Sequence, residues 1–136
     1  MDKILYKAGY KYQLAEPYTV RVSIQPAAFI FTPFIRLDVD GTLYITAAYA
    51  WDGPSGPTVD TKNFMRGSLV HDALYQLMRQ GHLSQDWREA ADQELRRLCI
   101  EDGMSSLRAW WVYQGVRFGG GPAAMPSGEA PLLGAP

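Results

Sequence analysis

The 136-residue sequence is poor in the residues and segments on which several classes of protein depend. A single cysteine, Cys99, excludes an intramolecular disulfide, and one cysteine with two histidines gives too few ligands for a structural zinc site. No stretch approaches the roughly 20 consecutive apolar residues of a membrane span, and residues 1–7 lack the apolar run of a signal peptide. We therefore expect neither disulfides, nor a signal peptide, nor a transmembrane segment.

Clustered charge is also missing. The 13 lysines and arginines nearly balance the 14 aspartates and glutamates, the formal net charge is -1, and no basic block occurs. Because binding to nucleic acid depends on clustered positive charge, we predict no nucleic-acid partner. The sequence also lacks a Walker phosphate loop and a G-x-S-x-G elbow. It has no histidine before His71 that could complete an H…HD…D phosphohydrolase.

The first fifty residues have the alternating pattern of half-buried β-strands. Apolar side chains at positions 18, 20, 22 and 24 alternate with polar ones, and the pattern returns over 35–39. Asp40-Gly41 separates that run from another at 43–47, and Asp-Gly between two such runs is a strong hairpin signal. We expect residues 1–50 to form a small, mostly antiparallel sheet, to which residues 10–14 add a strand.

The composition changes at residue 51. Two prolines and two glycines within 52–57 predict a stiff loop over 51–62. Apolar residues at helical spacing then predict three helices within 63–119: one from an Asn63 cap to Gly81, one from Ser84 to Gly103, and one from about Ser105 to Phe118. The predicted class is α+β, with a single globular domain over 1–121 and a Pro/Gly/Ala-rich tail over 122–136.

The third predicted helix is apolar on most sides and contains Trp110 and Trp111. Such a helix is usually buried or covered by a partner. We expect the two tryptophans to belong to the core, with a partner as the alternative.

The candidate site lies on the first predicted helix. His71 and Tyr75 are four residues apart and share a face, whereas Asp72 is turned by about 100°. Gly67, one turn before His71, would admit either a substrate to the imidazole or a closely packed helix. On the second helix, Asp92 could either orient His71 or pair with Arg88 or Arg96.

A purely structural interpretation of these residues stays open. His71 would then be a core histidine bonded to a loop carbonyl, and Asp72 would hold the backbone N–H groups of the proline-rich loop.

Two resemblances arise at these residues. Over most of the globular part, the order Trp51-Asp52-Gly53, Ser68 to Tyr75, Ala91-Asp92 and Phe118-Gly119 resembles an uncharacterised family of tailed bacteriophages and prophages. This resemblance implies a phage gene product, either part of the virion or encoded beside lysis and tail genes. It implies no activity.

The second resemblance covers only Gly53 through Asp92 and is to the phospholipases of the A-two type. His71-Asp72-Ala73-Leu74-Tyr75 matches their helix motif H-D-x-x-Y. The resemblance implies that His71 activates water and that Asp92, helped by Tyr75, fixes its tautomer. It also implies that Asp72 binds calcium, together with the carbonyl groups around Gly53 and Gly56. The loop departs from the enzymes' G-x-G pattern, since Pro54 follows Gly53.

From these residues we expect a phage-encoded accessory or virion-associated protein with a calcium-assisted ester hydrolase site. The catalytic candidates are His71, Asp92 and Tyr75, and the metal candidates are Asp72, Gly53, Gly56 and Asp52. The alternative is a non-catalytic assembly protein that binds other phage proteins, or itself, through residues 105–136. Membrane lipid is a partner only under the hydrolase hypothesis. The expected location is the virion or the host cytoplasm.

Overall fold

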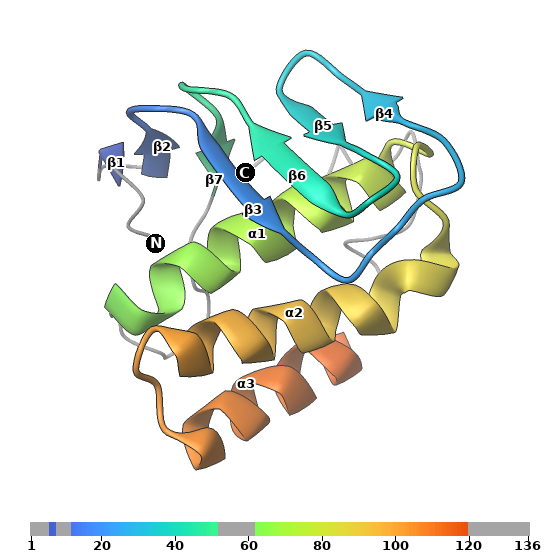
Figure 1. Ribbon diagram of the computed structural model, residues 1–136. Coiled ribbons are helices and arrows are strands. Elements are labelled where there is room, and N and C mark those ends of the chain that lie inside the picture. The colour runs from blue at the N-terminus through green and yellow to red at the C-terminus, as the bar shows by residue number, and fades with distance from the viewer. Residues whose placement is uncertain (1–5, 8–11, 52–61, 120–136) are drawn as a thin grey trace.

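The structure is a computed structural model that describes residues 6–7, 12–51 and 62–119. These residues form short antiparallel strands followed by three α-helices, which confirms the predicted α+β class (Figure 1). The strands are β1 (Tyr6–Lys7), β2 (Tyr12–Leu14), β3 (Tyr18–Arg21), β4 (Ile30–Phe31), β5 (Ile35–Leu37), β6 (Thr42–Ile45) and β7 (Ala50–Trp51). The helices are α1 (Lys62–Arg79), α2 (Arg88–Glu101), which follows a 3-10 turn at Gln85–Trp87, and α3 (Ser106–Gly119).

The predicted hairpin joins β5 and β6 within a four-stranded sheet of order β3-β6-β5-β4. Gly41 occupies its turn with a φ of 93°, and a Cβ atom there would come within 2.3 Å of the carbonyl oxygen of Val22. The turn therefore requires glycine. The strand predicted near residues 10–14 is β2, but it belongs to a second sheet of order β1-β2-β7. The described residues up to Trp51 thus form two antiparallel sheets, and Pro17, which has no N–H to donate, lies between β2 and β3 along the chain.

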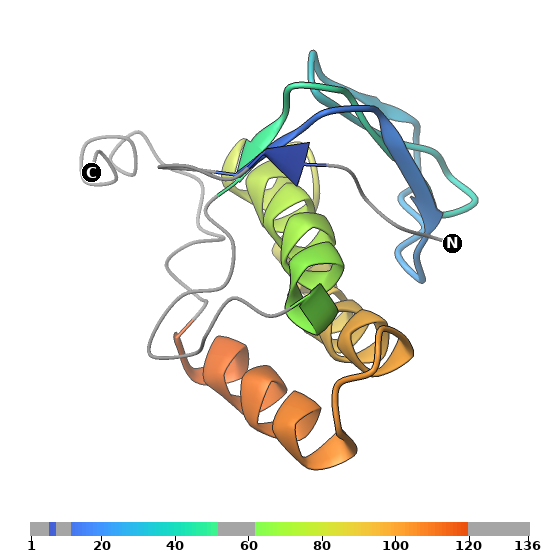
Figure 2. The same ribbon diagram turned by 90° about the vertical axis from the view of Figure 1, so that its left-hand side faces the viewer.

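The core lies between the four-stranded sheet and α1. Along β5 and β6, Ile35, Leu37, Leu43 and Ile45 are fully buried, and the residues between them face the opposite side of the sheet. Helix α1 runs across the inner face of this sheet, and most of its residues are buried (Figure 1). Helix α2 packs on α1, and α3 packs on α2 at the greatest distance from the sheet (Figure 2).

Gly67 faces α2, which decides between its two interpretations. A Cβ atom at this position would lie 3.0 Å from both Cys99 Sγ and Leu95 Cδ1. The missing side chain therefore serves close packing of α1 on α2 and does not open a path to His71. The predicted helix ends agree with the structure, since Gly81 and Gly103 have positive φ angles after α1 and α2. Asn63 lies inside α1 and is not its cap.

The expectation that α3 is buried is wrong for the chain alone. Ala109 is its one buried residue, while Trp111 is 63% exposed and Trp110 is 39% exposed. Among the described elements α3 packs mainly on α2, on the side away from the sheet, so the sheet does not cover the outer face of α3 (Figure 2).

Most of the loop predicted over 51–62 and the whole tail predicted over 122–136 lie outside the described residues. Within the residues that are described, no helix has the length and apolar character needed to cross a membrane.

Candidate functional site

Two helices bring the three catalytic candidates together. His71 and Tyr75 lie one turn apart on α1, and Asp92 lies on the facing side of α2. The Nε2 atom of His71 is 2.7 Å from Asp92 Oδ1, and the Tyr75 hydroxyl donates to the same oxygen at 2.6 Å. The rings of His71 and Tyr75 also touch, with their centroids 4.1 Å apart.

Asp92 is fully buried and is held in its ionised form. Burial would raise the pKa of its carboxyl, but the hydrogen bonds from His71 and Tyr75, the electrostatic attraction of His71 and the hydrogen bond from Arg117 together leave the pKa below its usual value. An ionised carboxylate can only accept hydrogen bonds, so the proton on His71 must sit on Nε2. In neutral His71 the Nδ1 atom then carries the lone pair, and no described residue hydrogen-bonds to it.

Tyr75 keeps its proton in this environment. Burial, followed by the hydrogen bond to Asp92, raises the pKa of the Tyr75 hydroxyl above its usual value. The hydroxyl therefore donates to Asp92, and it accepts a hydrogen bond from Arg88 Nε at 3.2 Å. This arrangement makes Tyr75 a positioning residue for Asp92.

Helix α3 contributes the partner of the second carboxylate oxygen of Asp92. Arg117 Nη1 lies 2.8 Å from Asp92 Oδ2, so the second carboxylate oxygen is also paired. Arg88 Nη2 donates to the carbonyl oxygens of Val116 and Arg117 at 3.2 and 2.9 Å, near the C-terminal end of α3. All three helices therefore meet at Asp92.

Sequence reasoning found His71, Tyr75 and Asp92 but missed the role of Arg117. No spacing rule connects Arg117 with Asp92, because the two lie on different helices 25 positions apart. The alternative partners proposed for Asp92 do not contact it. Arg88 binds Tyr75 and the end of α3, and Arg96 lies over the ring of Tyr113.

The predicted calcium ligands are only partly described. Asp72 lies on α1 beside His71 and is half-buried, but Asp52, Gly53 and Gly56 lie outside the described residues. Among the described residues, no group of three or more histidine, cysteine, aspartate or glutamate side chains could hold a metal ion. Both interpretations of Asp72, as a calcium ligand and as a loop brace, stay predictions.

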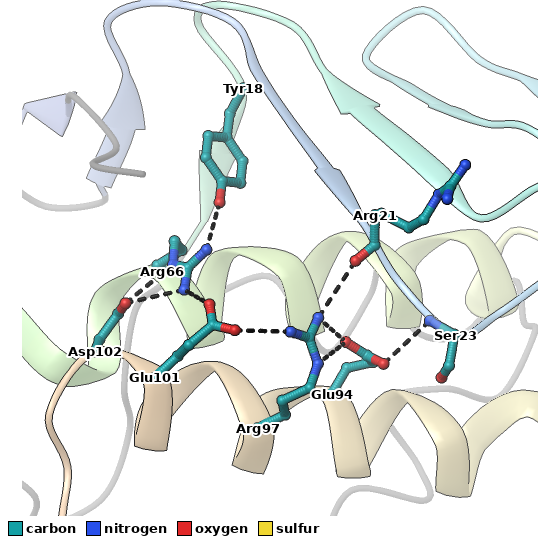
Figure 3. Close-up of polar contacts among 8 residues, drawn as sticks. All are labelled: Tyr18, Arg21, Ser23, Arg66, Glu94, Arg97, Glu101 and Asp102. Atoms are coloured by element: carbon teal, nitrogen blue, oxygen red, sulfur yellow. Dashed lines mark hydrogen bonds and ion pairs between the residues drawn. The ribbon is translucent and has the colours of Figure 1, made fainter. Parts of the chain in front are cut away.

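A second network, which is partly buried, was not predicted, and it joins the sheet to the helices (Figure 3). Its centre is Arg66 on α1, which is 6% exposed. Arg66 binds Asp102 through Nε and Nη2 at 3.1 and 2.9 Å, and it also binds Glu101 and the hydroxyl of Tyr18. Although burial opposes its charge, the hydrogen bonds to Asp102, Tyr18 and Glu101 raise the pKa of Arg66.

The network continues along α2 to the end of β3. Arg97 binds both Glu94 and Glu101, and Glu94 accepts a hydrogen bond from the backbone N–H of Ser23 at 3.1 Å (Figure 3). These contacts attach α2 to the sheet. Their one signal in the sequence is that Glu94, Arg97 and Glu101 follow the spacing of three and four residues at which helical side chains meet.

Comparison of the chain with protein-family models, with curated proteins and with solved structures gives no match.

Proposed function

We propose that the protein is a hydrolase in which His71 is the general base and Asp92 is the residue that positions it. One observation carries this proposal: a buried, ionised Asp92 binds Nε2 of His71 and so leaves the lone pair on Nδ1. The geometry also agrees with what the resemblance to A-two phospholipases implies, since Tyr75 supports Asp92 by a hydrogen bond of 2.6 Å. The proposed substrate class is therefore a carboxylic ester of a lipid.

The reaction follows from the charge state of these groups. Nδ1 of His71 takes a proton from water as the water oxygen bonds to the ester carbonyl carbon. The resulting imidazolium is stabilised by the negative charge of Asp92, which remains ionised throughout. As the tetrahedral intermediate collapses, the carbon–oxygen bond to the alcohol breaks, and His71 returns its proton to the departing oxygen.

Calcium is the proposed cofactor of this site. Asp72 follows His71 directly, and a half-buried carboxylate is a ligand of the type that calcium prefers. Asp72 would hold the ion with Asp52 and the carbonyl groups around Gly53 and Gly56. A bound calcium ion would polarise the ester carbonyl and stabilise its developing negative charge.

The hydrolase proposal is tested by fatty-acid release from phospholipid vesicles with calcium present. His71→Ala should reduce release by at least about a hundredfold, since general-base catalysis contributes roughly 10²- to 10⁴-fold. His82→Ala is the matched control, because His82 is the other histidine and is exposed. Equal release by wild type and His71→Ala would remove the proposal.

Calcium binding is tested separately by calorimetric titration of wild type and Asp72→Asn. We expect the wild-type protein to bind calcium and the Asp72→Asn protein to bind it much more weakly. Asp86→Asn is a suitable control, because Asp86 is an exposed aspartate on the 3-10 turn and not on the helix that carries His71. Binding that is the same in all three proteins would exclude Asp72 as a ligand.

We also propose that the hydrolase acts as an accessory or virion-associated protein of a tailed phage. The support for this context is the resemblance of residues 51–119 to the phage family. Immunodetection in purified particles of a phage that encodes the chain tests it. Presence at constant copy number supports a virion component, and absence from particles supports an accessory role in the host.

A second candidate function is that of a non-catalytic assembly protein. The observation that favours it is the exposure of large apolar side chains on α3, with Leu107 at 69%, Trp111 at 63% and Phe118 at 88%. Apolar side chains grouped in this way are typical of a surface that binds another protein. In this case, Leu107→Ser with Trp111→Ser should prevent incorporation into particles or self-association, whereas His71→Ala should change neither.

A further inference from the structure

The outer face of the four-stranded sheet carries a row of three stacked side chains. Phe31 on β4 pairs with Arg36 on β5, and Arg36 pairs with Tyr44 on β6. The guanidinium carbon of Arg36 lies 4.9 Å from the centre of the Phe31 ring and 5.0 Å from that of Tyr44. Two aromatic rings in neighbouring strands therefore hold the guanidinium group in a fixed orientation.

Arg36 has no polar partner in the described part of the chain, where its Nε is the one buried side-chain nitrogen or oxygen without a hydrogen bond. Arg21, on the same face of the sheet, binds Asp40 at 3.0 Å. Arg66 and Arg97 are likewise paired with carboxylates. The buried Nε cannot reach another molecule, but the two Nη groups are not among the buried atoms and have no described partner, so they are suited to an end-on bidentate bond with a carboxylate from another molecule.

Exposed phenylalanines lie beside this arginine: the Phe31 ring stacks on it, the Phe29 ring lies 6.4 Å from that of Phe31, and Phe34 precedes Arg36 by two residues. Phe29, Phe31 and Phe34 are 53%, 60% and 47% exposed, respectively. β4 is the last strand at its side of the sheet, and among the described strands it pairs only with β5. Its outer edge can therefore pair with an added extended segment.

We propose that this face binds an extended segment of another protein, in which a glutamate or aspartate pairs with Arg36 and neighbouring apolar side chains cover the exposed phenylalanines. Charge complementarity supports a carboxylate, because Arg36 is positive and lacks a partner. A nucleic acid fits less well, since its phosphates need several free positive charges and the turn beside Arg36 carries Asp38 and Asp40. The proposal is independent of the hydrolase site, because it involves none of the same residues.

The test screens a displayed library of random twelve-residue peptides for binding to the full chain. We expect the selected peptides to combine an acidic residue with aromatic or branched apolar residues. One selected peptide is then titrated against wild type, Arg36→Met and Arg21→Met. Arg36→Met should weaken its binding about tenfold or more, while Arg21→Met should leave the affinity within about twofold.

Two further measurements separate loss of the site from loss of the fold. Thermal unfolding by circular dichroism should show that Arg36→Met remains folded. Phe29 is exposed and lies outside the stacked row, and Phe29→Ala should independently weaken peptide binding. A second peptide carries the amide (Asn or Gln) in place of the acidic residue. Wild type should bind this amide peptide as weakly as Arg36→Met binds the original peptide. Arg36→Met should bind the two peptides with nearly equal affinity.

Three outcomes would overturn the proposal. They are the selection of no peptide, the selection of peptides without an acidic residue, and equal peptide affinities for wild type and Arg36→Met. Arg36-dependent binding of an oligothymidine, without acidic-peptide binding, would assign the face to nucleic acid instead.

Discussion

The part of the chain that the structure describes contains two polar networks, one centred on Arg66 and one on Asp92, which differ in burial and in whether a side-chain nitrogen is left without a described partner. The hydrogen bonds that Arg66 donates all go to side chains of other residues. Two of these partners, Asp102 and Glu101, have 24% and 52% of their side-chain surface exposed. In the other network the Asp92 side chain is fully buried. It pairs with Nε2 of His71, and Nδ1 of that histidine is hydrogen-bonded to no described residue. Among the described residues, the first network connects the sheet to the helices, whereas the second ends on a histidine nitrogen that no described residue binds.

The comparison also shows that pairing alone does not identify a site. Both networks shift pKa values, lowering that of Asp92 and raising that of Arg66. A shifted pKa therefore marks a buried ion that has found partners, whether or not it functions. What distinguishes the Asp92 network is a histidine whose tautomer is fixed by the carboxylate.

The largest effect on stability should follow from Asp92→Ala. This change leaves the imidazole of His71 and the hydroxyl of Tyr75 without their acceptor, and it removes the partner of Arg117. Asp92 is fully buried while Arg117 is 30% exposed, and the loss of the three hydrogen bonds that end on this carboxylate should cost about 3–5 kcal/mol of unfolding free energy. Urea unfolding followed by circular dichroism measures this cost, and a loss below about 1 kcal/mol would contradict the central role given to Asp92.

A smaller loss is expected for Arg66→Met. Methionine can fill the buried volume, and Asp102 and Glu101 can turn to solvent because they are already partly exposed. We expect a loss of about 1.5–3 kcal/mol, the range for hydrogen bonds to charged groups. The same urea experiment measures it, with Arg21→Met as the control for removal of an exposed arginine. If Arg66→Met costs more than Asp92→Ala, the ranking of the two networks is wrong.

Acid should weaken the Asp92 network in a predictable direction. The folded-state pKa of Asp92 lies below its ordinary value of 3.8, so the carboxylate stabilises the fold above that value. This stabilisation is lost as the pH falls through the lower folded-state pKa. The unfolding free energy of wild type should therefore fall below about pH 4 more steeply than that of Asp92→Asn. Parallel curves would show that Asp92 is not held ionised by its partners.

The parts of the fold that were predicted correctly depend on local sequence. The Asp40-Gly41 turn, Ser84 at the start of the 3-10 turn, and Gly81 and Gly103 after two helices are each determined by a few adjacent residues. His71 and Tyr75 also follow from helical spacing. The contacts of Asp92 with Arg117 and of Arg66 with Tyr18 depend on how distant segments pack, which no local pattern determines. The exposure of Trp111 was missed for the same reason, because an apolar helix has one sequence pattern whether or not another element covers it.

The smallest effect is expected at the solvent-exposed part of the Arg66 network. The hydrogen bond from Arg66 lowers the pKa of Glu101, but half of the Glu101 side chain is exposed and Arg66 retains Asp102 as a partner. Glu101→Gln should therefore cost only about 0.5 kcal/mol at low salt, as is typical of exposed ion pairs. The cost should nearly vanish in about 1 M salt, where charges are screened within a few ångströms, whereas the cost of Asp92→Ala should persist because Asp92 is shielded from the solvent. Urea unfolding of both variants at the two salt concentrations measures this contrast, and equal salt sensitivity would mean that the two networks do not differ in burial as described.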